Sequence, residues 1–278
     1  MDQNIVIVGL GLIGGSLAKA FRACGGFTVT GIDRDGAVLR KALETGAIDR
    51  AGSEEDIRLA DILYLCLYPQ ADVDFTREHR KVIRPGCLVT DTCGIKSWLC
   101  PRMTALAKES GFVFVGGHPM AGKEKNGFDQ SDGTLFRGAS YILVPCGAPH
   151  RDVERLEAVA LKLGFSGTVE TTPEEHDRII AFTSQLPHVL ACAYVQSPQC
   201  PKHRGFSAGS YRDVSRVATI NETMWTELFL ENRSALVKEL DTLTGHITEI
   251  RDAIASGNAE ALSSLLRKGR LIKEALGE

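Results

Sequence analysis

Short apolar runs alternate with amphipathic stretches from residue 4 to about residue 171. The first run, NIVIV at residues 4–8, is rich in β-branched residues and is typical of a strand buried on both faces. The same reading predicts strands at residues 27–32, 62–67, 87–90, 112–115 and 141–144, and helices at about 16–24 and 37–45. Strands that alternate with helices predict an α/β fold with a doubly wound, mostly parallel sheet.

The strand pattern stops near Thr172, and the remaining chain has helical spacing. One helix is predicted from Pro173 to Tyr194 or beyond, with a kink where Pro187 removes a backbone donor. A long amphipathic helix is predicted from Asn221 to Gly257, followed by a final helix. This change predicts two domains, an α/β domain at residues 1–171 and an all-α domain at residues 172–278.

The long predicted helix carries an apolar seam with heptad spacing. Its members are Leu236, Leu240, Leu243, Ile247, Ile250 and Ile254. The seam packs either within its own domain or against a second subunit. A helical domain of about 105 residues has little core of its own, so the seam favours a homodimer through the C-terminal helices.

Composition narrows the range of partners. The 278 residues include 32 basic and 35 acidic side chains, a formal net charge of −3, whereas nucleic-acid binding needs a clear basic excess. No apolar run approaches the roughly 20 residues of a membrane span, and the N-terminus lacks signal-peptide features. The eight cysteines lack the close paired spacing of structural zinc sites. We therefore expect a cytoplasmic protein with reduced thiols and no nucleic-acid, membrane or metal partner.

A glycine-rich turn follows the first strand and opens a helix, the context in which G-x-G-x-x-G indicates a Rossmann-type dinucleotide site. Its residues are Gly9, Leu10, Gly11, Leu12, Ile13 and Gly14. Asp33 follows nineteen residues after Gly14, at the end of the second strand, where a carboxylate can accept both ribose hydroxyls and would repel a 2′-phosphate. This favours NAD as the cofactor, although Arg34 could pair with the phosphate of NADP.

Ligands of open α/β sheets bind beyond the carboxyl ends of the strands. Leu67 and Tyr68 leave one predicted strand at this edge, and we expect them to contact the cofactor. His118 lies in a glycine-bracketed loop, GGHPMAG, after another. A histidine there suits proton removal from a hydroxyl as hydride leaves the same carbon, because its intrinsic pKa is near neutral.

The helical half must complete the pocket. Asp177, Ser184 and His188 have the spacing of one α-helical face. Arg212 and Arg216 are four residues apart, and the spacing fits either recognition of a carboxylate or a solvated basic face equally well.

These motifs resemble the prephenate/arogenate dehydrogenase family over essentially the whole chain. They are VGLGLIGGSLA at the start, GGHPMAG-x-E at residues 116–124, HD…SQLPH at 176–188 and SYRDVSRVA…W at 210–225. The resemblance implies NAD-dependent oxidative decarboxylation of prephenate to 4-hydroxyphenylpyruvate in tyrosine biosynthesis. It also implies that His118 and His188 are catalytic, that Arg216 holds a substrate carboxylate, and that Glu124 lies near the pocket mouth.

Two positions depart from the family pattern. Many members have a serine at the position of Gly94, where it orients the catalytic histidine. Here that task falls to another group, for which a backbone carbonyl, Cys93 and water are the candidates named by the sequence. Many have a histidine at the position of Gln185, which bears on contacts to the substrate side chain. The choice between prephenate and arogenate therefore stays open. A β-hydroxyacid dehydrogenase, which would use a catalytic lysine, and a non-catalytic NAD-sensing protein are the remaining alternatives.

Overall fold

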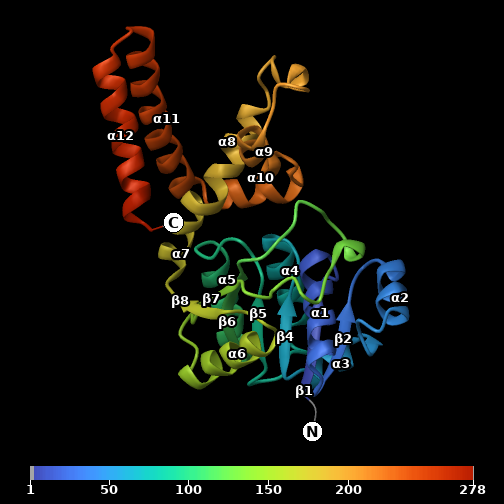
Figure 1. The fold of residues 1–278 in the computed structure, drawn as a ribbon. Helices are drawn as coiled ribbons and strands as arrows, with labels where there is room; N and C mark the ends of the chain where they lie inside the picture. The colour runs from blue at the N-terminus through green and yellow to red at the C-terminus, as the bar shows by residue number, and fades with distance from the viewer. Residues whose placement is uncertain (1–2, 278) are drawn as a thin grey trace. The chain divides into compact units, whose positions relative to one another are not determined.

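Eight strands form one sheet in the computed structural model, which describes residues 3–277 (Figure 1). The strands are β1 (Gln3–Val8), β2 (Phe27–Ile32), β3 (Arg50–Ala51), β4 (Ile62–Leu65), β5 (Leu88–Asp91), β6 (Val113–Pro119), β7 (Ser140–Val144) and β8 (Gly167–Glu170). Their order in the sheet is β3-β2-β1-β4-β5-β6-β7-β8. The pairs from β3 to β6 are parallel, and only the β6–β7 pairing is antiparallel. The predicted doubly wound, mostly parallel sheet is confirmed.

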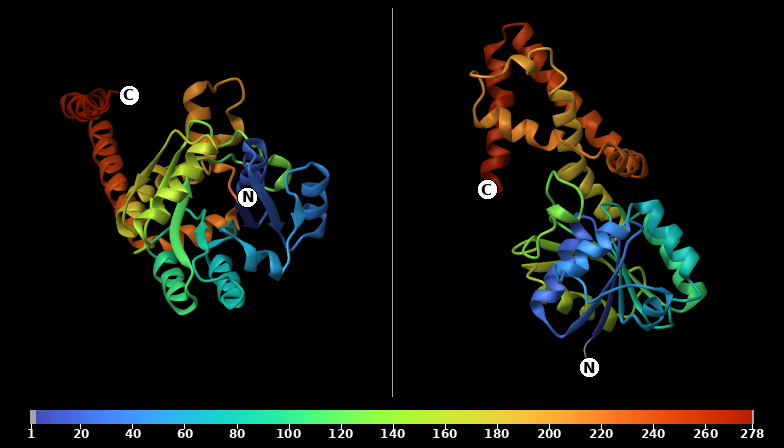
Figure 2. Two further views of the ribbon diagram at one scale, coloured as in Figure 1. Left: turned by 90° about the horizontal axis from the view of Figure 1, so that it is seen from below. Right: turned by 90° about the vertical axis from the view of Figure 1, so that its right-hand side faces the viewer.

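The sheet is covered on both faces, as the views in Figure 2 show. Alternate residues of β1 belong to different cores: Ile5 and Ile7 pack with one, Val6 and Val8 with the other. The first core also takes side chains from helices α1 (Leu12–Cys24), α2 (Gly36–Glu44) and α6 (His150–Lys162). The second takes side chains from α3 (Glu54–Leu59), α4 (Pro69–His79) and α5 (Leu99–Ser110). β1 is therefore buried on both faces, as its uniform apolar run predicted.

β6 extends further than the sequence indicated. Its parallel pairing with β5 ends at Val115, but antiparallel pairing with β7 continues from Gly116 to Pro119. His118, expected in a loop, therefore lies in a strand opposite Ile142. The strands β3 and β8 were not predicted, because β3 has two residues and the edge strand β8 is a mixed run, GTVE.

The helical half begins with one nearly continuous rod. α7 (Pro173–Ile180) is capped by the Thr172 side chain, a turn of π-helix (Ala181–Gln185) follows, and α8 (Leu186–Tyr194) continues it. The disturbance predicted at Pro187 takes the form of this π turn. Because a π turn contains an extra residue, the α-helical spacing that placed Asp177, Ser184 and His188 on one face does not hold across it.

The long helix predicted from Asn221 is wrong, because the structure divides it in two. Asn221 caps α10 (Glu222–Glu231), and α11 (Arg233–Ala255) begins after Asn232. The Asn232 amide nitrogen donates to the backbone oxygen of Asp177 (2.9 Å) and to Oε1 of Gln185 (2.8 Å), and its backbone leaves the helical conformation. The shorter helices η1 (Phe128–Gln130), η3 (Cys200–Lys202), α9 (Gly209–Ser215) and η4 (Arg216–Ala218) complete the elements before it.

The chain separates into two compact units, residues 1–232 and residues 233–278. The second unit is a hairpin of α11 and α12 (Ala259–Ala275), which lie side by side and are joined at Gly257 and Asn258 (Figure 1). The boundary predicted at residues 171 and 172 marks the end of the sheet, and as a division between domains it stays a prediction. Across residues 3–277, no helix combines the length and the apolar character that crossing a bilayer requires.

Candidate active site

The glycine turn between β1 and α1 is built to hold backbone close to a ligand. A Cβ atom on Gly14 would lie 1.9 Å from the Gly9 carbonyl oxygen, so this glycine allows the helix to pack against the turn. Gly9 has a φ of +86°, and a Cβ there would meet the Cys66 carbonyl oxygen at 2.7 Å. A Cβ on Gly11, the N-cap of α1, would meet no atom within 4 Å. The open space beside Gly11 and the amides of the helix N-terminus fit a pyrophosphate.

Asp33 faces this turn. Its Oδ2 accepts from the Leu10 amide at 2.7 Å and its Oδ1 accepts from the Asp35 amide at 2.9 Å, so the carboxylate is fixed beside the glycine turn. Arg34 is exposed. On the neighbouring strand end, the Leu67 side chain packs over Gly9, and Tyr68 Oη accepts a hydrogen bond of 2.9 Å from Asn221. Asp33 and Leu67 therefore lie against the glycine turn, and this arrangement fits NAD.

His118 is held by a histidine that sequence reasoning missed. His118 Nδ1 lies 2.9 Å from Nε2 of His176 in α7, and His176 Nδ1 lies 2.7 Å from Oδ1 of Asp177. The Asp177 carboxylate also accepts from the backbone amides of Lys96 and Ser97, at 2.7 and 2.8 Å. The orienting group that the sequence left open is therefore His176, which was not among the three named candidates. The HD dipeptide was visible in the sequence, but its contact with His118 spans 58 residues.

Burial decides the charge of both histidines. It lowers the pKa of His118 well below its usual value, and the nearby charges of His176 and Lys96 act in the same direction. Burial also lowers the pKa of His176, although the hydrogen bond to Asp177 opposes it. Burial alone would raise the pKa of Asp177, but His176 and the backbone amides of Lys96 and Ser97 outweigh it and lower it. Near pH 7 the hydrogen-bonded line of Asp177, His176 and His118 therefore consists of a carboxylate and two neutral imidazoles.

Gly94 leaves room beside His118. A Cβ on Gly94 would lie 3.8 Å from His118 Cε1 and 3.7 Å from the methyl groups of Leu228 in α10. The neighbouring Cys93 thiol points elsewhere, donating to Asp72 Oδ2 at 3.0 Å. Gly117, just before His118, has no such room, because a Cβ there would meet the Tyr141 hydroxyl at 2.3 Å. Gly94 thus makes space at the histidine, whereas Gly117 is required for the strand to pack.

A buried ionic cluster lies at the end of β5. Oxygen and sulfur atoms of Asp72, Asp91 and Cys93 lie within 4.8 Å of one another, but the cluster already contains a cation, because Lys96 Nζ lies 2.7 Å from Asp91 Oδ2. Burial lowers the pKa of Lys96, but the Asp91 carboxylate together with Cys93 and Cys100 outweighs burial, so the pKa is raised. Burial and the charge of Asp91 raise the pKa of Asp72 to about 8. The cluster fixes the loop that carries Gly94 and the amides bound by Asp177.

His188 belongs to a second group on the helical side. Its ring stacks on Trp225 of α10, with centroids 3.8 Å apart, and its Nδ1 lies 2.8 Å from the Ser184 carbonyl oxygen. Burial lowers the pKa of His188, and the charges of Glu124 and Arg216 act on it in opposite directions. Glu124 and Arg216 form an ion pair with each other. The structure therefore places His188 near Glu124 and Arg216, the residues that the family resemblance assigns to the substrate pocket.

α10 connects the two groups. Trp225 and Leu228 are one helical turn apart, so the stack on His188 and the contact beside Gly94 and His118 come from one face of this helix. Gln185 is buried, and both ends of its amide have partners: its nitrogen donates to the Leu228 carbonyl oxygen (3.3 Å) and its oxygen accepts from Asn232. The geometry thus gives Gln185 a role in joining α10 to the π turn, beside its predicted contact with substrate.

Two family descriptions match this chain, and together they span most of its length. The family description "Prephenate dehydrogenase, nucleotide-binding domain" matches residues 17–167, and "Prephenate dehydrogenase, dimerization domain" matches residues 172–268. A prephenate dehydrogenase of Bacillus subtilis (strain 168) is 31% identical, over 99% of this chain and 76% of the relative.

Solved structures of similar proteins have the same fold over almost the whole chain. The crystal structure of prephenate dehydrogenase from A. aeolicus with hydroxyphenyl propionate and NAD+ has a TM-score of 0.85 and 27% identity, covering 99% of each chain. Synechocystis arogenate dehydrogenase has a TM-score of 0.82 and 27% identity, covering 99% of this chain and 100% of that one.

Proposed function

The chain belongs to the prephenate dehydrogenase family, and from this premise we propose that it oxidises and decarboxylates prephenate with NAD, releasing 4-hydroxyphenylpyruvate and CO₂. The observation that carries the proposal is the neutral His118, tied through His176 to Asp177 at the cofactor edge of the sheet. A neutral imidazole can take a proton from a substrate hydroxyl, and its position matches the edge where the sheet binds its ligand.

His118 supplies the proton transfer. Its Nδ1 faces His176, so its Nε2 is the atom available to take the proton of the ring hydroxyl. Bound NAD would supply the hydride acceptor for the carbon that bears this hydroxyl. The departing CO₂ leaves its electron pair in a ring that becomes aromatic, and the phenolate oxygen then takes a proton back to form the hydroxyl of the product, so the side chains need to move only this one proton.

The remaining residues bind and orient. The glycine turn and the N-terminus of α1 would hold the pyrophosphate, Asp33 the adenosine ribose, and Leu67 and Tyr68 the nicotinamide side. Arg216 would take a substrate carboxylate, for which its ion pair with Glu124 must open. His188, stacked on Trp225, would complete the substrate side of the pocket.

Arogenate is the second candidate substrate. The similarity to the arogenate dehydrogenase of Synechocystis, with a TM-score of 0.82, favours testing it. Arogenate carries an amino acid side chain in place of the keto acid, so the two substrates differ in charge at the end remote from the reacting carbon.

A steady-state assay of both substrates, each with NAD and NADP, tests the proposal. We expect the highest kcat/KM with prephenate and NAD. We expect His118→Asn to lower kcat by about 10²–10⁴-fold with little change in KM. Because burial lowers the pKa of His118, kcat/KM should fall on acidification only well below pH 6.5.

Other results would change the assignment. A higher kcat/KM with arogenate would make that compound the substrate. Tight NAD binding without NADH production from either substrate would support the NAD-sensing alternative. Near wild-type turnover of His118→Asn would remove His118 from the mechanism.

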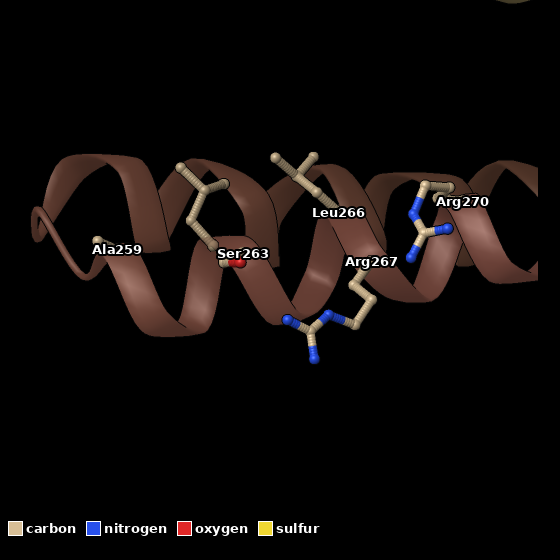
Figure 3. Close-up of a pocket in the computed structure, with 6 residues that line it drawn as sticks. Ala259, Ser263, Leu266, Arg267 and Arg270 are labelled. Carbon is tan, nitrogen blue, oxygen red and sulfur yellow. The ribbon is translucent and has the colours of Figure 1, made fainter.

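We also propose a homodimer assembled through the C-terminal helices, in a cytoplasmic location. The match to a dimerization domain supports the dimer, and so do the apolar side chains that α11 and α12 expose. Ile247 and Ile254 of the heptad seam are 50% and 60% exposed. Figure 3 shows side chains of α12 that line a shallow pocket, with Leu266 between Ser263 and Arg270. The spacing of the eight cysteines, which fits neither a zinc site nor a short disulfide-bonded scaffold, supports the cytoplasmic location.

A further inference from the structure

We propose that His176 and Asp177 are positioning residues, which hold His118 in the single tautomer whose Nε2 is free to take the substrate proton. The inference rests on the proposed function and deepens it, because it names the groups that prepare the base. It starts from the observation that three side chains from two elements form one unbroken line of hydrogen bonds, 2.7 and 2.9 Å long.

The direction of every hydrogen bond in this line is fixed from one end. The Asp177 carboxylate accepts two backbone amides, from Lys96 and Ser97, and can only accept from His176 as well. His176 Nδ1 must therefore carry the proton, which leaves Nε2 of the same neutral ring as an acceptor. His118 Nδ1 must then donate to it, so the lone pair of His118 is on Nε2.

The surroundings leave His176 and Asp177 to determine which nitrogen of His118 carries the proton. His176 and Asp177 are both almost completely buried, at 2% and 3% exposure, so water does not compete for their polar atoms. Gly94 brings no side-chain atom to His118, and the Cys93 thiol is engaged with Asp72. The charged groups around the pair are Asp91 and Lys96, which bind each other, and Asp177 itself. His176 is thus the side chain that bonds to His118 Nδ1 in this part of the structure.

The tautomer has a chemical consequence. An isolated neutral histidine favours the proton on Nε2, and in that form His118 would present a donor, rather than a base, to the substrate hydroxyl. Losing the correct tautomer lowers kcat while the substrate still binds, as in a triad whose orienting carboxylate is replaced.

Two substitutions at one position separate positioning from packing. His176→Leu keeps bulk but removes the acceptor, and we expect kcat to fall about 10–10³-fold with KM and NAD affinity within about threefold. His176→Gln places an amide oxygen where Nε2 stood, so it should recover kcat to within about tenfold of wild type. His79→Gln is the matched control, a half-buried histidine of α4 bonded to a carbonyl oxygen, and should leave kcat unchanged.

A second readout does not depend on turnover. In ¹⁵N NMR spectra of the wild type near pH 7.5, His118 should appear with Nδ1 protonated and Nε2 unprotonated, and His176→Leu should shift it toward the Nε2-protonated form. Retention of the Nδ1-protonated form in His176→Leu, or equal kcat for the Leu and Gln variants, would overturn the proposal. If His176→Leu does not fold, the wild-type spectrum decides, because a protonated Nε2 contradicts the inference. The spectrum tests it even if neither substrate is turned over.

Discussion

At the scale of single residues, Arg216 is the side chain that we propose binds a substrate carboxylate. It pairs with Glu124, and both charges lie close enough to His188 to act on its pKa. An exposed ion pair of this kind contributes about 0–1 kcal/mol, so a substrate carboxylate can displace Glu124 at little cost. The ion pair therefore keeps the Arg216 side chain in position but contributes little to the stability of the fold.

We expect Arg216→Ala to raise KM for prephenate about 10–100-fold with kcat within about threefold, because it removes a charge-assisted contact made before and during the reaction. Steady-state kinetics measure the effect. Arg212→Ala, one turn earlier in α9, is the control and should leave KM unchanged. An unchanged KM for Arg216→Ala, or an equal rise for Arg212→Ala, would contradict the assigned carboxylate role.

The sequence identified the residues that stand where a strand or motif ends, and missed those whose role depends on distant contacts. His118 could be proposed because ligands of open α/β sheets bind at the edge where parallel strands end, and its catalytic role stays a prediction. His176 was not singled out, because only folding brings α7 against β6. Gln185 was expected at the substrate, and its two amide partners became visible only when α10 was placed against the π turn.

At the scale of elements, the glycine turn contains two glycines, Gly11 and Gly14, that are needed for different reasons. Gly14 is required by the packing of α1 on the turn, whereas Gly11 borders open space at the helix N-terminus. The same substitution should therefore fail in different ways at the two positions.

We expect Gly14→Ala to destabilise the protein by about 1–3 kcal/mol and to weaken NAD binding, because its Cβ cannot coexist with the Gly9 carbonyl oxygen. Gly11→Ala should change the free energy of unfolding by less than about 0.5 kcal/mol but weaken NAD binding at least about tenfold, because its methyl group projects where the pyrophosphate would lie. Urea denaturation and isothermal titration measure the two quantities. Unimpaired NAD binding by Gly11→Ala would place the pyrophosphate elsewhere.

Helices and strands with a continuous apolar pattern were predicted well. Elements whose ends depend on hydrogen bonds to distant parts of the chain were not. The buried strands β1, β2, β4, β5 and β7 were placed within a residue or two of their observed ends. β6 was predicted too short, because its last four residues are paired by β7 rather than by β5. The helix from Asn221 was predicted too long, because the break at Asn232 arises from hydrogen bonds to residues about 50 positions earlier.

At the scale of the whole molecule, the second compact unit, residues 233–278, has too few residues for a core of its own. Its exposed large apolar side chains include Val237, Ile247, Ile254, Leu266, Leu271, Ile272 and Leu276. Covering these side chains with a second copy removes apolar surface from water, at about 25 cal/mol per Å².

We expect sedimentation velocity to show a dimer at micromolar concentration, and the double variant Ile247→Lys/Ile254→Lys to sediment as a monomer. Each lysine would bring a charge into the interface, where desolvation is costly. Thr244→Lys, an exposed polar position of the same helix, is the control and should stay dimeric. A monomeric wild type would refute the predicted homodimer.

The π turn at residues 181–185 also limits how this protein can vary in length. Each residue of a helix advances it by about 100°, so deleting one residue there would turn His188 and all of α8 about a third of a revolution away from Trp225. Substitutions can be absorbed at the exposed positions of this turn, Phe182 and Thr183, but insertions and deletions cannot. Descendants of this sequence should therefore keep the number of residues between His176 and His188 even where they change the residues themselves.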